Sequence, residues 1–97
     1  MTARRGPSEK EFLAQVVALA RLRGWFTYHT HDSRRSTAGF PDLILCRRER
    51  IIAAELKVGN RQPTPEQEAW LVALWIAGVQ AEVWRPSAWP EIEAALE

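Results

Sequence analysis

Two apolar segments separated by a short charged break are the feature that most constrains the fold of this chain. Residues 43–46 and 51–58 have the length and composition of strands, and the four charged residues between them have the length of a hairpin connection. Side chains alternate along a strand, so Glu55 and Lys57 share one face of the second segment. Asp42 immediately precedes the first segment, and a hairpin places it opposite Glu55 and Lys57.

The convergence of Asp42 and Glu55 has a chemical consequence. Two carboxylates at that distance repel each other unless positive charge lies between them, and a hard divalent cation with oxygen ligands meets that need. The alternative is structural: Asp42 belongs to a turn after Pro41, and Glu55 forms a surface ion pair with Lys57. Either half of the pattern alone favours this alternative, whereas both halves on adjacent strands favour a metal site.

The order of these residues resembles a known nuclease motif. Gly39-Phe40-Pro41-Asp42, twelve intervening residues and then Glu55-Leu56-Lys57 resemble the PD-(D/E)XK motif. A glutamate on a preceding helix, together with Thr64-Pro65-Glu66-Gln67 opening a following helix, extends the resemblance to the VRR-NUC family over residues 8–86. The resemblance implies an α/β fold with a restriction-endonuclease-like αβββαβ core, in which helices flank a mixed four-stranded sheet.

The pattern along the chain predicts the same order of elements. A flexible basic N-terminus, 1–7, precedes a single nuclease-like domain, 8–97. The signals for helix starts and stops predict one helix from Ser8 to Gly24 and a second from Thr64 to Gly78. Further strands are predicted at 25–30 and 79–84, and Ser87 is predicted to cap a final short helix.

Composition limits the class of protein. Ninety-seven residues predict one domain, and without a visible signal peptide or membrane span the protein is expected to be cytoplasmic. The single cysteine, Cys46, excludes a disulfide framework and a thiolate metal site, and it is predicted to be a small buried residue. Five tryptophans are many for this length, and one or more of them is predicted to lie at a subunit contact.

Charge is distributed unevenly along the chain. Residues 1–61 carry twelve Lys/Arg against six Asp/Glu, a net charge of +6, whereas residues 62–97 carry one against six, a net charge of −5. The basic part also contains Asp42, Glu55 and Lys57, so the distribution suits a polyanion lying across that face. The alternative is chance segregation of solvated charge.

The first predicted helix offers two acids for the site. Ser8 and Glu11 have the spacing of a capping box, which explains Glu11 structurally. Glu9 lies on the apolar stripe that is predicted to pack on the sheet, and the family pattern places its acid there, so Glu9 is predicted to hold a metal-bound water. Gln67 has two interpretations: a capping box with Thr64, or a residue that shapes the active site, as the resemblance implies.

Basic and polar side chains around the first strand are predicted to contact DNA phosphates. The pattern of His29, His31 and Asp32 lacks a third soft ligand, so a zinc site is disfavoured, and a solvated loop is the alternative. The arginines of the 47–50 hairpin tip are expected only to keep that tip soluble. The predicted phosphate contacts are Arg4, Arg5, Lys10, His29, Ser33, Arg34, Arg35, Ser36 and Arg61.

The resemblance implies a mechanism and a substrate. Asp42, Glu55 and the Leu56 carbonyl would hold Mg²⁺ or Mn²⁺. Glu9 would bind the ion through a water, and Lys57 would position or deprotonate the attacking water.

The expected activity is endonucleolytic hydrolysis of DNA, selective for four-way (Holliday) junctions. The expected enzyme is a homodimer without a small-molecule cofactor or a membrane partner. The alternatives are a non-catalytic nucleic-acid-binding module and a subunit of a larger recombination or restriction complex.

Overall fold

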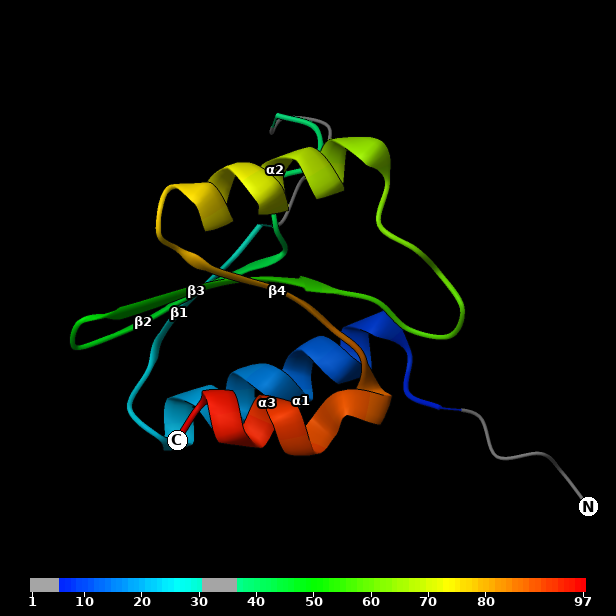
Figure 1. Ribbon diagram of the computed structural model, residues 1–97. Helices are drawn as coiled ribbons and strands as arrows, with labels where there is room; N and C mark the ends of the chain where they lie inside the picture. The colour runs from blue at the N-terminus through cyan, green and yellow to red at the C-terminus, as the bar shows by residue number, and fades with distance from the viewer. Residues whose placement is uncertain (1–5, 31–36) are drawn as a thin grey trace, which may run out of the picture.

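A four-stranded sheet lies between helices in the computed structural model, which describes residues 6–30 and 37–97. Figure 1 shows α2 on one face of the sheet, and α1 and α3 side by side on the other. The α-β-β-β-α-β-α order predicted from the sequence is confirmed. In chain order the elements are α1 (Glu9–Leu22), β1 (Phe26–His29), β2 (Leu43–Arg47), β3 (Arg50–Leu56), α2 (Pro65–Ile76), β4 (Gln80–Trp84), a 3₁₀ turn η1 (Pro86–Ala88) and α3 (Trp89–Ala95).

The sheet is mixed, as predicted. Its strand order is β1-β2-β3-β4; β1, β2 and β3 pair antiparallel, and β4 pairs parallel with β3. In the predicted hairpin, Leu43 lies opposite Ala54, so the start of β2 adjoins the end of β3. This register brings Asp42 to the strand end that carries Glu55.

Both predicted capping boxes are present. The Glu11 N–H donates to Ser8 Oγ at 3.1 Å and Glu11 Oε1 accepts from the Ser8 N–H at 2.8 Å. The corresponding distances between Gln67 and Thr64 are 3.2 and 2.8 Å. These bonds satisfy amide groups that a helix N-terminus leaves without intrahelical partners, which is why the two helices begin where the sequence predicts. Ser87 is not a cap, because η1 precedes α3 and no side chain caps that helix.

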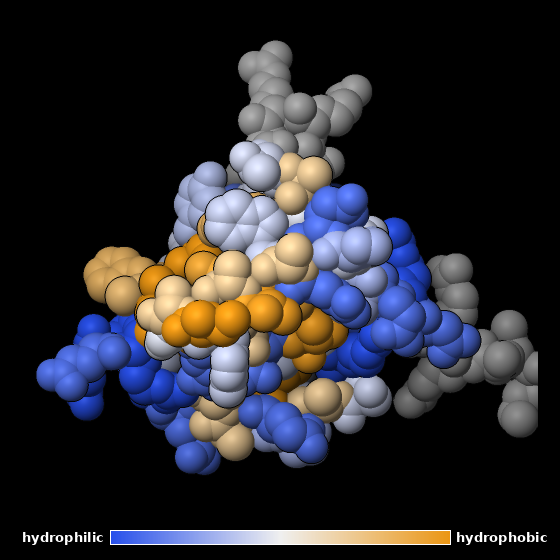
Figure 2. Space-filling model, turned by 45° about the horizontal axis from the view of Figure 1, so that its top comes forward, coloured by the Kyte–Doolittle hydropathy of each residue, from blue (hydrophilic) through white to orange (hydrophobic). Residues whose placement is uncertain are grey.

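The sheet face beneath α2 is only partly covered. The helix packs mainly on β4 and β3, and none of its residues is fully buried. Cys46 lies on this face of β2 and is exposed, so the prediction that it is buried is wrong. The alternation of the strand explains the error, because the neighbouring Leu45 takes the buried side. In Figure 2, where the α2 side comes forward, hydrophobic side chains gather in a band.

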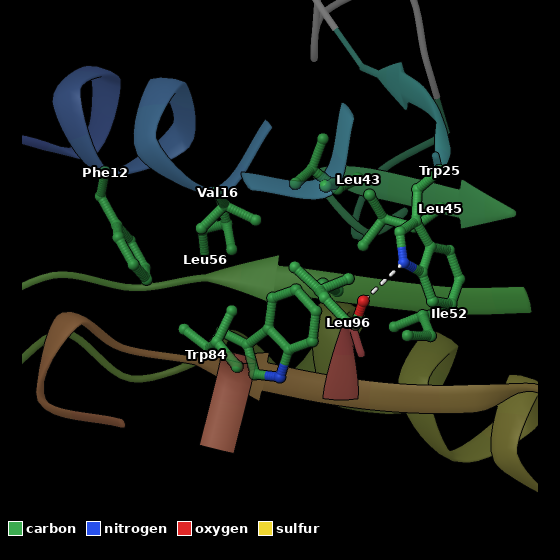
Figure 3. Packing of buried hydrophobic residues seen from close by; sticks show 12 residues of the cluster. Phe12, Val16, Trp25, Leu43, Leu45, Ile52, Leu56, Trp84 and Leu96 are labelled. Atoms are coloured by element: carbon green, nitrogen blue, oxygen red, sulfur yellow. Dashed lines mark hydrogen bonds between the residues drawn. The ribbon is translucent and has the colours of Figure 1, made fainter. Parts of the chain in front are cut away.

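The opposite face of the sheet carries the core. Figure 3 shows side chains of α1, the strands and the C-terminal helix interlocked there. Trp25 closes one end, since its Nε1 donates to the Leu96 carbonyl at 3.0 Å. Burial of this continuous cluster is the dominant favourable term in folding. Its buried members are Phe12, Val16, Ala20, Trp25, Leu43, Leu45, Ile52, Ala54, Leu56, Trp84, Ile92 and Leu96.

The hairpin-tip arginines also fix the C-terminal helix, which corrects the expectation that they serve solubility alone. The guanidinium groups of Arg47 and Arg50 lie 4.7 and 5.0 Å from the ring centroid of Trp25. Arg50 also donates to the Ala95 carbonyl at 2.8 Å, and Arg47 donates to the Glu97 carbonyl. Cations at a helix C-terminus satisfy its free carbonyl groups, so these contacts stabilise the end of α3.

Candidate active site

Asp42 is held where the loop before β2 meets the end of β3. Its Oδ2 accepts the Leu56 N–H at 2.8 Å, and its carbonyl accepts the Thr30 N–H at 3.0 Å. Thr30 also donates through Oγ1 to the Pro41 carbonyl at 3.2 Å. These bonds from β1 and β3 fix the carboxylate between the two strand ends.

Glu55 and Lys57 are buried beside Asp42. Glu55 is 1% exposed and Lys57 is 6% exposed, values that charged side chains rarely reach without a partner. The Lys57 Nζ lies 3.4 Å from Glu55 Oε2. The other carboxylate oxygen, Glu55 Oε1, is buried and has no hydrogen-bond partner among residues 6–30 and 37–97. An orphaned carboxylate oxygen is costly to bury, so this atom lacks an interaction that a bound group would supply.

The pKa of Glu55 is raised from 4.5 to about 7, mainly by burial and then by the neighbouring Asp42, while Lys57 opposes the shift. The protein therefore keeps an acid whose charged form is disfavoured in the absence of additional positive charge. Such perturbed carboxyl groups cluster at functional sites.

The residues present fit a hard divalent cation. Asp42 and Glu55 supply two carboxylates, and the orphaned Glu55 Oε1 needs a cation or a donor. Within residues 6–30 and 37–97, no group of three or more His, Cys, Asp or Glu side chains is placed to hold a metal. Two carboxylates with a backbone carbonyl and waters match the ligand set of Mg²⁺ better than that of a zinc site.

A cleft of about 650 Å³ opens beside Asp42. It contains six residues predicted for the site, Glu9, Lys10, His29, Asp42, Leu56 and Gln67. Glu55 and Lys57 do not line it and lie buried behind it. Asp42 and Leu56 line the cleft and adjoin the buried Glu55 and Lys57.

The Gly39-Phe40 turn docks on α2. Gly39 has a φ of +91°, and an added Cβ would lie 2.5 Å from the Glu66 carbonyl group and 2.8 Å from the Gln67 nitrogen. The close approach that only glycine permits at this position is thus made to the backbone of α2. Phe40 meets Trp70 edge to face at 5.1 Å, so this side chain packs against α2.

The two acids of α1 lie in different surroundings. Glu11 is in the capping box, whereas Glu9 lines the cleft. Glu9 is nevertheless exposed, so the expectation that it packs on the sheet is wrong. It is the first residue of the helix and lies one turn before Phe12, where burial begins. Gln67 takes part in both features: its Oε1 completes the capping box with Thr64, and the residue also lines the cleft.

The predicted phosphate contacts divide into three groups. Lys10 and His29 line the cleft, whereas Arg61 is exposed in the loop before α2 and does not line it. The others, Arg4, Arg5, Ser33, Arg34, Arg35 and Ser36, lie outside the described residues.

Sequence reasoning missed several residues that line the cleft. Leu13 of α1, Thr30 after β1 and Thr37 belong to it. The place of Thr30 at the predicted strand end was the available signal. Thr30 and Thr37, the two described residues that flank positions 31–36, both line the cleft.

Comparisons with known proteins agree with this geometry. The family model of the VRR-NUC domain matches residues 3–88, whereas no curated protein matches the chain. A solved structure described as a VRR_NUC domain protein shares 26% identity and a TM-score of 0.67, covering 84% of this chain and 79% of that chain. Hjc of Archaeoglobus fulgidus, a Holliday junction resolvase, shares 17% identity and a TM-score of 0.59, covering 77% of this chain and 66% of that chain. The second likeness shows a shared fold, and the match to most of the chain shows that the protein belongs to the VRR-NUC family.

Proposed function

We propose that this protein is a metal-dependent DNA endonuclease that cleaves four-way junctions selectively. A VRR-NUC domain is a nuclease domain, and the fold is shared with a Holliday junction resolvase. The observation that carries the proposal is the convergence of Asp42 with Glu55, whose buried Oε1 has no hydrogen-bond partner in the described part of the chain.

Asp42, Glu55 and the Leu56 carbonyl would hold Mg²⁺ or Mn²⁺, with Glu9 acting through a water. The orphaned Glu55 Oε1 supports this assignment, as does the place of Asp42, Leu56 and Glu9 in one cleft. When bound, the ion polarises the scissile phosphate and lowers the pKa of a bound water.

Lys57 and Gln67 would complete the catalytic set. The Lys57 ammonium lies 3.4 Å from Glu55 and is nearly buried, so its charge is little screened by solvent. It would position or deprotonate the attacking water and offset charge that develops on the phosphate. Gln67 would shape the opposite wall of the cleft from the first turn of α2.

DNA would be bound through its phosphates, with Lys10 and His29 inside the cleft. Arg61 and the predicted contacts at positions 4–5 and 33–36 would add further phosphate contacts. A homodimer would present two equivalent clefts about a two-fold axis, which matches the two-fold symmetry of a four-way junction. The part of the chain that the structure describes contains no helix long and apolar enough to cross a membrane.

A cleavage assay tests the proposal. Junction, flap and linear DNA of matched sequence are incubated with Mg²⁺, with Mn²⁺ or with a chelator. We expect paired nicks in the junction that require a metal. Asp42→Asn and Lys57→Ala should lower the rate by about 10²–10³-fold, because stabilisation of the transition state by the ion and by a placed donor is worth several kcal/mol.

Glu49→Gln is the matched control, since it removes an exposed acid at the hairpin tip and should leave cleavage unchanged. Junction binding without cleavage in either metal would instead indicate a non-catalytic nucleic-acid-binding module.

A further inference from the structure

A groove of about 460 Å³ lies between α1 and the edge strand β1. Lys10, Leu13 and His29 line both this groove and the cleft beside Asp42, so the groove continues directly from the cleft. The other residues that line the groove are Ala14, Val17, Arg21, Thr27 and Tyr28.

The chain direction fixes the two ends of the groove. The helix α1 begins with Glu9 at the cleft and runs away from it, and β1 returns to the cleft at His29. Lys10 therefore lies at the cleft end, whereas Arg21, in the last turn of α1, lies at the far end. There Arg21 Nε donates to Thr27 Oγ1 at 3.2 Å, which holds the guanidinium group beside the groove.

The groove has positive charge at both ends. Lys10 and Arg21 are exposed, and none of the described residues that line the groove is acidic. The eleven steps from Lys10 to Arg21 are about three helical turns, so both side chains lie on one face of α1, roughly 16 Å apart along its axis. That distance equals about five nucleotides of a stacked strand at 3.4 Å each, and fewer of an extended strand. The two cations are therefore placed to contact separate phosphates of one strand.

Between the two cations the wall of the groove is apolar. Leu13, Ala14 and Val17 lie on the same face of α1, and Leu13 and Val17 are half-buried. Apolar side chains suit the sugars and base faces that an unpaired strand exposes. A duplex presents mainly its charged backbone to such a surface, because its bases are paired and stacked inside.

The strand β1 adds contacts of two kinds. It is the first strand in the sheet order, so one of its edges has no neighbouring strand among residues 6–30 and 37–97. The N–H groups on such an edge and the Thr27 hydroxyl are donors for phosphate oxygens. Tyr28 is 62% exposed and borders the groove at this edge, where its ring offers a face on which a base can stack.

We propose that this groove binds an unpaired strand of branched DNA where that strand leaves the active-site cleft. Lys10 and Arg21 would contact its phosphates, and Tyr28 would stack on a base. The inference rests on the proposed function for its substrate, DNA, and adds a physical reason for a preference for branches. Strands separate at a branch point, whereas a linear duplex can fill the groove only at the cost of unpairing its bases.

Fluorescence anisotropy in the presence of a chelator tests the proposal without cleavage. The probes are a labelled blunt duplex and the same duplex with a single-stranded arm of about ten nucleotides, placed at the 5′ end in one probe and at the 3′ end in another. We expect one of the two armed duplexes to bind at least about 10-fold more tightly than the blunt duplex, because stacking and added phosphate contacts both contribute.

Variants of Arg21 and Tyr28 separate the two contributions. Arg21→Gln should weaken binding of the armed duplex by about 3–10-fold and lower the slope of log K against log salt concentration by about 0.7, the value for one single-strand phosphate. Arg21→Lys should keep the slope. Tyr28→Thr should weaken binding by about 5-fold or more without changing the slope, whereas Tyr28→Phe should bind as the wild type does, since its ring still stacks.

Arg48→Gln is the matched control. Arg48 is an exposed cation at the hairpin tip and does not line the groove, so its removal should leave the advantage of the armed duplex unchanged. Circular dichroism checks that each variant is folded, which is expected because Arg21, Tyr28 and Arg48 are all exposed.

Three results would overturn the proposal. The first is equal binding of the armed and blunt duplexes by the wild type. The second is an equal loss for both duplexes in Arg21→Gln and Tyr28→Thr, and the third is a loss in Arg48→Gln as large as in these two variants. None of these results depends on cleavage, because no metal is present. A chain that fails to cut any DNA but prefers the armed duplex would support the groove and contradict the proposed nuclease activity.

Discussion

The sheet face under α1 and α3 carries the buried core, whereas the face under α2 carries the buried Glu55 and Lys57 and the exposed aromatic side chains of β1. On the first face the buried side chains of the strands are all apolar and belong to the cluster around Phe12 and Trp25. On the second face the buried groups include Glu55 and Lys57, and α2 contributes no fully buried residue. The first face thus supplies most of the stability. The second face buries the charged Glu55 and Lys57, which is costly, and leaves the apolar side chains of β1 exposed.

The same residue type on the two faces gives the largest expected contrast in stability. Phe12→Ala should lower the free energy of unfolding by about 3–5 kcal/mol, because it leaves a cavity in the core. Phe26→Ala should change it by no more than about 0.5 kcal/mol when measured by urea unfolding at concentrations where any dimer dissociates. Equal losses would mean that the two faces do not differ in this way.

A pair of glycines tests whether the turn before Asp42 is fixed by α2. Gly39 and Gly78 both have positive φ, but only at Gly39 does an added Cβ meet backbone atoms. Gly78→Ala should cost about 1–2 kcal/mol from its dihedral alone. Gly39→Ala should cost about 1–3 kcal/mol more and also reduce cleavage, since the overpacked turn carries Asp42. Urea unfolding and the junction assay measure the two effects. If Gly39→Ala and Gly78→Ala behaved alike in both, the turn would not be fixed by its contact with α2.

Variants of Glu9 and Glu11, two acids in the same helix turn, should affect cleavage and stability differently. Glu11→Ala should lower the free energy of unfolding by about 0.5–2 kcal/mol through its capping box, with little effect on cleavage. Glu9→Ala should reduce cleavage and leave thermal unfolding unchanged, because Glu9 is exposed and lines the cleft. The reverse pattern would assign the site acid to Glu11.

The buried Glu55 should also make stability depend on pH. The pKa of Glu55 rises from 4.5 to about 7 in the folded chain, so between these values the folded state binds more protons than the unfolded state. The contribution of Glu55 to stability is therefore present below about pH 4.5 and is lost as the pH rises to about 7. Metal-free thermal unfolding should show wild type losing stability relative to Glu55→Gln across this window; a parallel course would contradict the raised pKa.

Local signals predicted the elements and the convergence of Asp42 with Glu55. Ser8 and Thr64 fix their helix starts through contacts three residues away, and strand alternation places Glu55 with Lys57. The exposure of Cys46 could not be read locally, because an apolar strand does not reveal which of its faces a helix will cover. The contacts of Arg47 with Trp25 and the C-terminus join segments far apart in sequence, so no short pattern indicates them.

Direct titration of the metal-free protein with Mn²⁺ by calorimetry tests the central claim that Asp42 and Glu55 together hold a divalent cation. We expect the wild type and Glu49→Gln to bind the ion alike, and Asp42→Asn and Glu55→Gln to lose most of that affinity while remaining folded. Undiminished binding in both site variants, or no binding by the wild type, would contradict the claim.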